Sequence, residues 1–100
     1  MEDDSQEKKP QVLVLPQMLH FLKTYAASSE VDLQRALSTY KMYESKEAVK
    51  RLQNELISIK ASKVAPAVLD RVISKRRITR YGSYERFAEL MILWLLQAKT

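Results

Sequence analysis

The chain has 100 residues, 46% of them hydrophobic, which is enough for one compact core but not for two. With one glycine and three prolines it is poor in the residues that build hairpin turns and phosphate-binding loops, and its lack of cysteine excludes disulfides and zinc–thiolate sites. The net charge of +5 is uneven, since residues 1–9 carry −2 and residues 10–100 carry +7, and this favours acidic partners.

The N-terminal segment MEDDSQEKKPQ is almost entirely polar and charged. We therefore expect residues 1–11 to form a disordered acidic tail and residues 12–100 to form a single helical domain. The tail lacks the apolar stretch of a signal peptide, and the longest apolar run, residues 90–96, is far shorter than the about twenty residues of a spanning helix. Together with the absence of cysteine, these features predict a cytoplasmic protein that does not cross a membrane.

Two helices are predicted in the first half of the chain. Residues 12–15 are apolar and end at Pro16, so we expect an extended arm that enters the core. Apolar residues at spacings of three and four then predict a helix from Pro16 to about residue 27. Ser28 and Ser29 are the expected N-caps of a second helix, which should run from about Glu30 to Tyr43.

The third and fourth helices are predicted from caps and apolar spacing. Ser45 can cap a helix whose apolar face repeats at intervals of three and four residues as far as Ile59. Pro66 marks the first turn of a fourth helix, which we expect to fray through residues 75–77.

The last helix differs from the others because it has almost no polar face. Residues 79–82 form the connection to it, with the only glycine of the chain at the turn, and Ser83 is its expected cap. The segment FAELMILWLLQ is apolar nearly all round, and such a helix is normally buried all round. It is therefore either the central helix of the bundle or a helix shared with another chain.

These elements predict an all-α fold, a compact bundle of four or five short helices. The apolar stripes also predict which side chains form its core. The expected core residues are Leu19, Leu22, Leu33, Leu37, Val49, Leu52, Leu56, Ile59, Val68, Leu69, Val72, Phe87, Leu90, Met91, Trp94 and Leu95.

The apolar last helix also predicts a binding surface for a protein partner. Aromatic residues and Met are enriched in the cores of protein interfaces. The candidate partner-binding residues are Tyr84, Met91, Trp94 and Leu95. The alternative is that these side chains only fill the core of the bundle.

A second candidate site is the basic segment RVISKRRITR, residues 71–80, which contains no acidic residue. Its candidate polyanion-binding residues are Arg71, Lys75, Arg76, Arg77 and Arg80. Arg71 and Lys75 should share one side of a helix, and Tyr81 and Tyr84 are possible stacking partners for a nucleic acid. The alternative is that these cations complement the C-terminal end of a helix and cover apolar surface with their stems.

No catalytic or metal site is predicted. His20 is the only histidine, and Glu85 and Glu89 share a helix face with no histidine beside them. A helix-turn-helix interpretation is also unfavourable, because the helix after Gly82 offers few polar groups to base edges. We therefore expect neither enzymatic activity nor a cofactor, a metal ion or a small-molecule substrate.

The sequence thus favours a non-catalytic helical interaction module of the adaptor or regulatory kind, which binds an acidic protein partner or itself. The alternative is binding to a nucleic-acid backbone through residues 71–80. A basic amphipathic helix can also lie on an anionic membrane, but the apolar face of residues 46–59 should be needed for the core.

Overall fold

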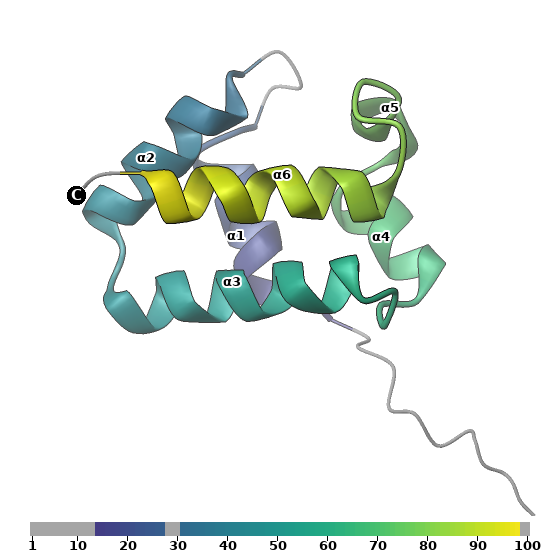
Figure 1. Ribbon diagram of the computed structural model, residues 1–100, viewed down its shortest axis with the longest axis horizontal. Helices are drawn as coiled ribbons and strands as arrows, with labels where there is room; N and C mark the ends of the chain where they lie inside the picture. Colours follow the sequence, from purple (N-terminus) through teal and green to yellow (C-terminus); the bar gives the residue numbers. More distant parts are fainter. Residues whose placement is uncertain (1–13, 28–30, 99–100) are drawn as a thin grey trace, which may run out of the picture.

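The structure is a computed structural model that describes residues 14–27 and 31–98. Within these ranges the chain forms six helices: α1 (Pro16–Thr24), α2 (Leu33–Tyr43), α3 (Lys46–Lys60), α4 (Pro66–Val72), α5 (Lys75–Ile78) and α6 (Tyr84–Gln97) (Figure 1). The predicted all-α bundle is confirmed, with one helix more than the upper limit of the prediction. The predicted disordered tail, residues 1–11, lies outside the described residues, as do the first two residues of the predicted arm.

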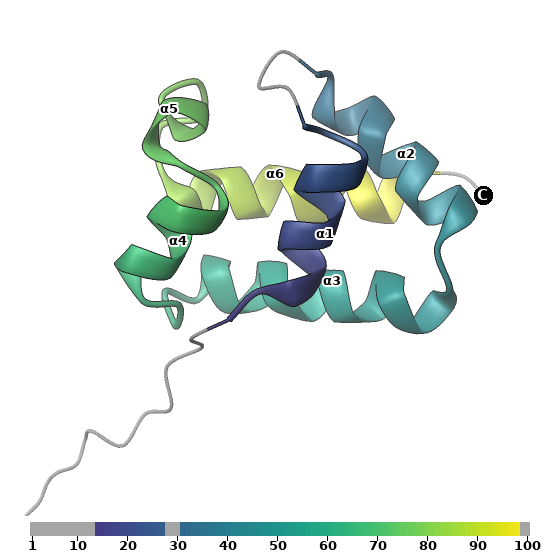
Figure 2. The same cartoon turned by 180° about the vertical axis from the view of Figure 1, so that it is seen from behind.

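The two longest helices, α3 and α6, lie side by side and run in opposite directions (Figures 1 and 2). Helix α1 crosses one side of this pair and packs mainly against α3 (Figure 2). Helix α2 packs against α6 at one end of the pair, while α4 and α5 lie at the other end (Figure 1). The side of the pair that faces the viewer in Figure 1 is covered by no further helix among the described residues.

One hydrophobic core fills the space between the helices, and most of the predicted core positions are confirmed. The buried ones are Leu22, Leu33, Leu37, Leu52, Leu56, Ile59, Val68, Leu69, Phe87, Met91 and Leu95. Val49, Val72, Leu90 and Trp94 are only partly buried. The prediction for Leu19 is wrong, since its side chain is 40% exposed. Helix α1 instead turns Met18, Phe21 and Leu22 inward, and Leu15 of the predicted arm joins the core.

The ends of α1 and α2 differ from the prediction. Helix α1 ends at Thr24, after which the chain buries Ala26 in the core. Helix α2 begins later than predicted because Asp32 is its N-cap, with a side-chain oxygen that accepts from the backbone N–H groups of residues 34 and 35. The predicted caps Ser28 and Ser29 lie outside the described residues.

The N-terminus of α1 is capped by a side chain from another helix. Leu15, at the N-cap position, offers no side-chain acceptor. The backbone N–H groups of Gln17 and Met18 donate instead to the carboxylate of Glu55 on α3, at 3.0 and 2.8 Å. Burial raises the pKa of Glu55, although both hydrogen bonds oppose this shift. Glu55 therefore fixes the start of α1 against the middle of α3.

The predicted fourth helix is broken in two. Helix α4 ends at Val72, and Ser74, with φ of 84°, begins α5 by accepting a hydrogen bond from the backbone N–H of residue 77. Both Ile73 and Ile78 are buried. On one continuous helix these two side chains would point about 140° apart. The break allows both of them to enter the same core.

The predicted caps of α3 and α6 are confirmed. Ser45 accepts from the backbone N–H of residue 48, and Ser83 accepts from that of residue 86. Gly82 precedes the second cap with φ of 96°, a conformation that favours glycine. None of the helices in the described ranges has the length and apolar character required to cross a bilayer.

Candidate protein-interaction surface

Helix α6 is only half covered by the rest of the fold. Its inner side, formed by Phe87, Ala88, Met91 and Leu95, is buried against α3 and α2. On its outer side Leu93 is 47% exposed and Leu96 is 61% exposed. Leu90, Leu93 and Leu96 follow each other at intervals of three residues and form what we call the leucine face.

The structure separates the four predicted partner-binding residues of this helix. Met91 and Leu95 belong to the core, with exposed fractions of 0% and 2%, so they do not line the surface. Tyr84 and Trp94 are partly buried against the core. The Tyr84 hydroxyl also donates to Asp70 Oδ1 at 2.6 Å, and this hydrogen bond joins α6 to α4. Desolvation, and to a smaller extent this hydrogen bond, raises the pKa of Tyr84. The exposed residues Leu93 and Leu96 were not among the candidates, because a helix that is apolar all round gives no sign of which side is covered.

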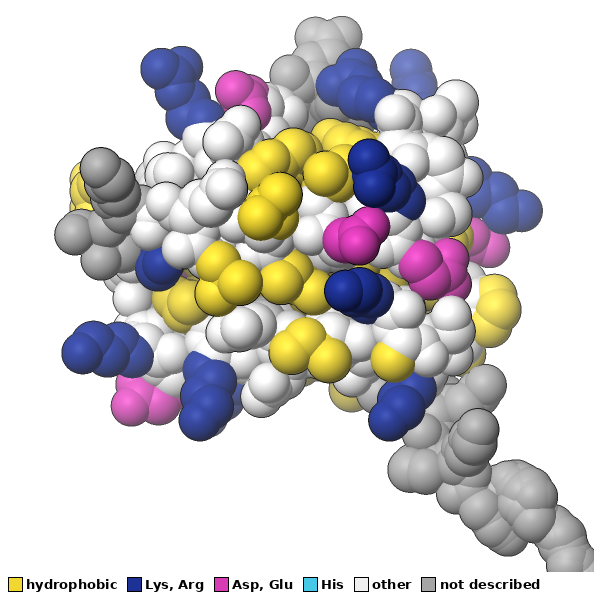
Figure 3. All heavy atoms as spheres, in the orientation of Figure 1, with side chains coloured by type: hydrophobic (Ala, Val, Ile, Leu, Met, Phe, Trp, Pro, Cys, Tyr) yellow, Lys and Arg dark blue, Asp and Glu magenta, His cyan; other side chains and the backbone are white. Residues whose placement is uncertain are grey.

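The leucine face borders a surface pocket of about 450 Å³, which we call the α6 pocket. It is lined by Lys60 of α3 and by Arg86, Glu89, Leu90, Ile92, Leu93 and Leu96 of α6. Figure 3 shows hydrophobic side chains gathered over α6 and α3 on this side of the molecule, with Lys and Arg side chains around them. The apolar surface therefore extends across both helices.

A second pocket of about 520 Å³, the α3 pocket, lies where α2 joins α3. It is lined by Lys41, Glu44, Lys46, Val49, Lys50 and Gln53. One face of α3 carries Gln53, which lines this pocket, then Ile57 four residues later, and then Lys60, which lines the α6 pocket, three residues after that. Ile57, which is 48% exposed, is thus placed between the two pockets.

Lys41 links the α3 pocket to the end of α6. Its Nζ donates to the carbonyl oxygens of Leu95 and Ala98, at 3.0 and 2.9 Å. These carbonyls belong to the last turn of α6, where helical partners are lacking and a cation is favourable. The α3 pocket therefore lies at the end of the pair where α3 begins and α6 ends, whereas the α6 pocket runs along α6 and reaches Lys60 at the opposite end of α3.

The charge around this surface is mainly positive. None of the three lysines Lys46, Lys50 and Lys60 forms an ion pair with a carboxylate among the described residues. Glu89 is engaged by Arg86 at 3.4 Å, one helical turn away, and both side chains are exposed. Glu44 of the α3 pocket is held from the other side by His20 and Tyr25.

The basic segment, residues 71–80, presents four cations to solvent rather than five. Arg71, Lys75, Arg76 and Arg80 are exposed. Arg71 and Lys75 do not share the side of one helix, as the sequence had suggested, because they belong to α4 and α5.

Arg77 is directed into the protein. Its Nη2 donates to the carbonyl oxygen of Ala26 at 3.3 Å, and its Nε and Nη1 are buried without a hydrogen-bond partner among the described residues. Desolvation lowers the pKa of this guanidinium. Arg77 therefore joins α5 to the segment after α1, which a pattern of charges along the sequence could not indicate.

The two tyrosines beside the basic segment are also engaged in the fold. Tyr81 packs edge-on against Phe87 at 5.1 Å between ring centroids and is partly buried. Tyr84 is held by Asp70, as described above. A polyanion at this end of the molecule would consequently meet cations more than aromatic rings.

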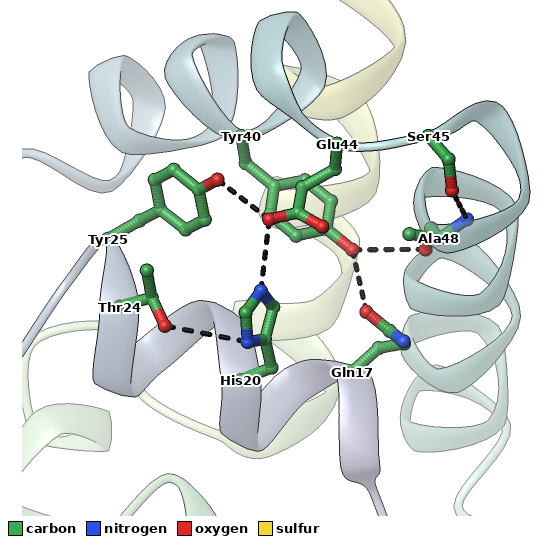
Figure 4. A network of polar contacts seen from close by, with 8 residues as sticks. All are labelled: Gln17, His20, Thr24, Tyr25, Tyr40, Glu44, Ser45 and Ala48. Carbon is green, nitrogen blue, oxygen red and sulfur yellow. Dashed lines mark hydrogen bonds and ion pairs between the residues drawn. The ribbon is translucent and has the colours of Figure 1, made fainter.

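A cluster of polar side chains lies on the α1 side of the molecule (Figure 4). His20 Nε2 lies 3.0 Å from Glu44 Oε2, and the Tyr25 hydroxyl donates to the same oxygen at 2.7 Å. The hydrogen bond from His20 lowers the pKa of Glu44, and the hydrogen bond to Glu44 raises the pKa of Tyr25 to about 12. These contacts join α1 to the end of α2.

The remaining contacts of this cluster are also structural. Thr24 Oγ1 lies 3.5 Å from His20 Nδ1, one helical turn along α1, which is at the outer limit of a hydrogen bond. The oxygen of the buried Tyr40 hydroxyl lies 3.0 Å from Gln17 Oε1 and 3.0 Å from the carbonyl oxygen of Ala48, so its single proton is shared between two acceptors. The described residues contain no group of three or more His, Asp or Glu side chains placed to hold a metal ion.

Comparison with protein-family models, with curated proteins and with solved structures finds no match to this chain. A functional interpretation therefore depends on the geometry of the surface alone.

Proposed function

We propose that this chain is a non-catalytic protein-interaction module of the adaptor or regulatory kind, whose partner covers the leucine face of α6. The observation that carries the proposal is the exposure of Leu93, Leu96 and Ile57 beside the two pockets. Removing about half of one such side chain from water contributes about 1 kcal/mol. Three of them, brought together in one interface, supply a substantial part of a specific binding energy.

The exposed apolar side chains form a continuous patch, which is better evidence for an interface than isolated exposed residues are. Single apolar residues are common on protein surfaces. Here the exposed side chains are joined by the partly buried Leu90 and Ile92 on α6 and by Val49 on α3. Continuous apolar surface with a polar rim is typical of protein–protein contacts.

The non-catalytic part of the proposal is supported by the state of the single histidine. His20 is engaged by Glu44 and Thr24 on the surface, in contacts that join helices. The absence of cysteine is consistent with a reducing compartment, and we propose the cytoplasm. Two partners meet the expectation from the sequence: an acidic protein and a second copy of the chain.

The proposal is tested by selecting ligands for the full chain from a displayed library of random 20-residue peptides. Each selected peptide is then measured against Leu93→Asp and against the matched control Leu19→Asp, which changes an exposed leucine on α1. We expect affinity to fall by about tenfold or more with Leu93→Asp and to stay within about twofold with the control. Circular dichroism and urea unfolding verify that both variants are folded.

The opposite results would overturn the proposal. If no peptide is enriched, or if the enriched peptides bind Leu93→Asp as well as the unchanged chain, the leucine face is not a binding surface.

A second candidate function, binding to a nucleic-acid backbone, is favoured by the four exposed cations of residues 71–80. Arg77 is committed to the fold, so we propose that Arg71, Lys75, Arg76 and Arg80 make the phosphate contacts. Such binding would depend steeply on salt and little on base sequence, because it neutralises phosphates and releases counterions.

Titration of a 20-base-pair DNA duplex at several salt concentrations tests this candidate. The double variant Lys75→Glu/Arg76→Glu should lower the slope of log K against log salt by about two, close to 0.9 for each lost phosphate contact. Arg51→Glu, an exposed cation on α3, is the matched control. An unchanged slope and affinity in the double variant would exclude this segment as the binding site.

A further inference from the structure

The two ends of the α3–α6 surface carry different charge. At the α3 pocket, Lys41, Lys46 and Lys50 stand beside one carboxylate, Glu44, which is engaged by His20 and Tyr25. The α6 pocket holds two cations, Lys60 and Arg86, and one carboxylate, Glu89, which pairs with Arg86. The excess of positive charge is therefore larger at the α3 pocket, with three cations to one carboxylate, than at the α6 pocket, with two cations to one carboxylate.

The carboxylates near the second end are engaged within the fold. Glu89 accepts from Arg86, and Glu85, in the first turn of α6, accepts from the Ser62 hydroxyl at 2.9 Å. Only Glu89 is neutralised by a cation, because the Ser62 hydroxyl that binds Glu85 is neutral. The positive field at the N-terminus of α3 is offset at the first end by Glu47 in its first turn and by the C-terminal end of the antiparallel α6 (Figure 1), so the positive charge comes from Lys46 and Lys50 themselves.

From this distribution, and on the basis of the function proposed above, we propose that the partner is an acidic amphipathic helix. Its apolar side lies on Leu93, Leu96 and Ile57, and its acidic residues lie over the α3 pocket, against Lys46 and Lys50. The partner is thereby defined by two features together, an apolar stripe and a cluster of carboxylates toward one end of that stripe.

A helix suits this surface better than an extended peptide does. The described residues include no strand of a sheet, so they offer no edge to which an extended peptide could add. The leucine face and the row from Gln53 through Ile57 to Lys60 both have the spacing of a helix surface. A third helix with apolar residues at i, i+3 or i+4 and i+7 can place its ridge between these two rows.

A second copy of the chain suits the surface less well. A symmetric dimer uses the same patch on both subunits, so it would bring two sets of the lysines of the α3 pocket into one interface. Like charges at a contact oppose association, whereas carboxylates on a partner would relieve the repulsion. The charge of the surface therefore favours a different, acidic chain.

The experiment continues from the peptides that the full chain selects. We expect the enriched sequences to carry the helical apolar spacing and a net negative charge, and the synthetic peptides to gain helical circular dichroism on binding. The double variant Lys46→Glu/Lys50→Glu should lower the affinity for these peptides by about tenfold or more. Raised salt should lower the affinity of the unchanged chain for them. The matched control Arg51→Glu, on another face of α3, should change affinity by less than about twofold.

Each other result overturns a defined part of the argument. Enriched peptides that are neutral or basic, but still lose affinity for Leu93→Asp, would reject the acidic helix and leave the proposed function standing. If the affinity of the peptides is unchanged by Leu93→Asp, both the proposed function and this inference are wrong.

Light scattering of the chain alone, at low and high salt, tests the competing occupant. We expect a monomer at both. A stable dimer that Leu93→Asp dissociates would assign the surface to a second copy and reject the acidic helix, while the proposed function would stand.

Discussion

Both sides of the α3–α6 pair carry apolar side chains, but they differ in how far other helices cover them. On one side α1 buries Met18, Phe21 and Leu22, and its N-terminus is capped by Glu55 of α3 (Figure 2). On the other side no helix among the described residues lies over Leu93 and Leu96 (Figure 1). Apolar residues alone therefore do not decide burial, because a covering element must also be available.

The largest expected effect comes from two neighbouring leucines of α6, one on each side. Leu95→Ala should lower the free energy of unfolding by about 2–5 kcal/mol, because it removes a buried side chain and leaves a cavity. Leu96→Ala should change it by less than about 1 kcal/mol, because that side chain is mostly in water. Urea unfolding measures both, and equal losses would show that the two sides do not differ in cover as described.

An intermediate effect is expected at the cap of α1, on the covered side. Glu55→Ala leaves the N–H groups of Gln17 and Met18 without their acceptor, which should destabilise the fold by about 1–3 kcal/mol. Glu55→Gln retains one carbonyl acceptor and should cost less. The same unfolding measurement compares them, and a neutral Glu55→Ala would mean that Glu55 is not needed to hold α1 in place.

The smallest effect is a contrast in pH dependence between two carboxylates. The pKa of Glu44 is below its ordinary value of 4.5, so its contribution to stability is present above that pH and is lost as the pH falls through the lowered pKa. The pKa of Glu55 is above 4.5, so the folded state holds this proton more tightly. The extra stability that comes from its protonated form is present below pH 4.5 and is lost as the pH rises through the raised pKa.

Urea midpoints between pH 3 and pH 7 should reveal this contrast in Glu44→Gln and Glu55→Gln. The stability advantage of the unchanged chain over Glu44→Gln should shrink as the pH falls, by less than about 1 kcal/mol because the ion pair is near the surface. The stability of the unchanged chain relative to Glu55→Gln should instead increase as the pH falls. Parallel pH profiles for the two variants would contradict the assignment.

The candidate site was partly predictable from the sequence. The apolar excess of residues 84–97 correctly pointed to α6 as a helix with more apolar surface than one side requires. It did not identify Leu93 and Leu96 as the exposed positions, because the pattern is the same around the whole helix. The cationic rim formed by Lys41, Lys46 and Lys50 was also missed, since the helical spacing does not show that the end of α2 and the start of α3 line one pocket.

The helical class, the apolar face of α3, and the caps Ser45 and Ser83 could be predicted from local sequence. These features depend on residues within a few positions of one another, so local spacing and local hydrogen bonds are sufficient to predict them. The tertiary structure decided the cap of α1 by Glu55 and the burial of Arg77 against Ala26. It also decided which side of α6 faces water, because contacts between residues far apart in the chain follow from packing and leave no local pattern.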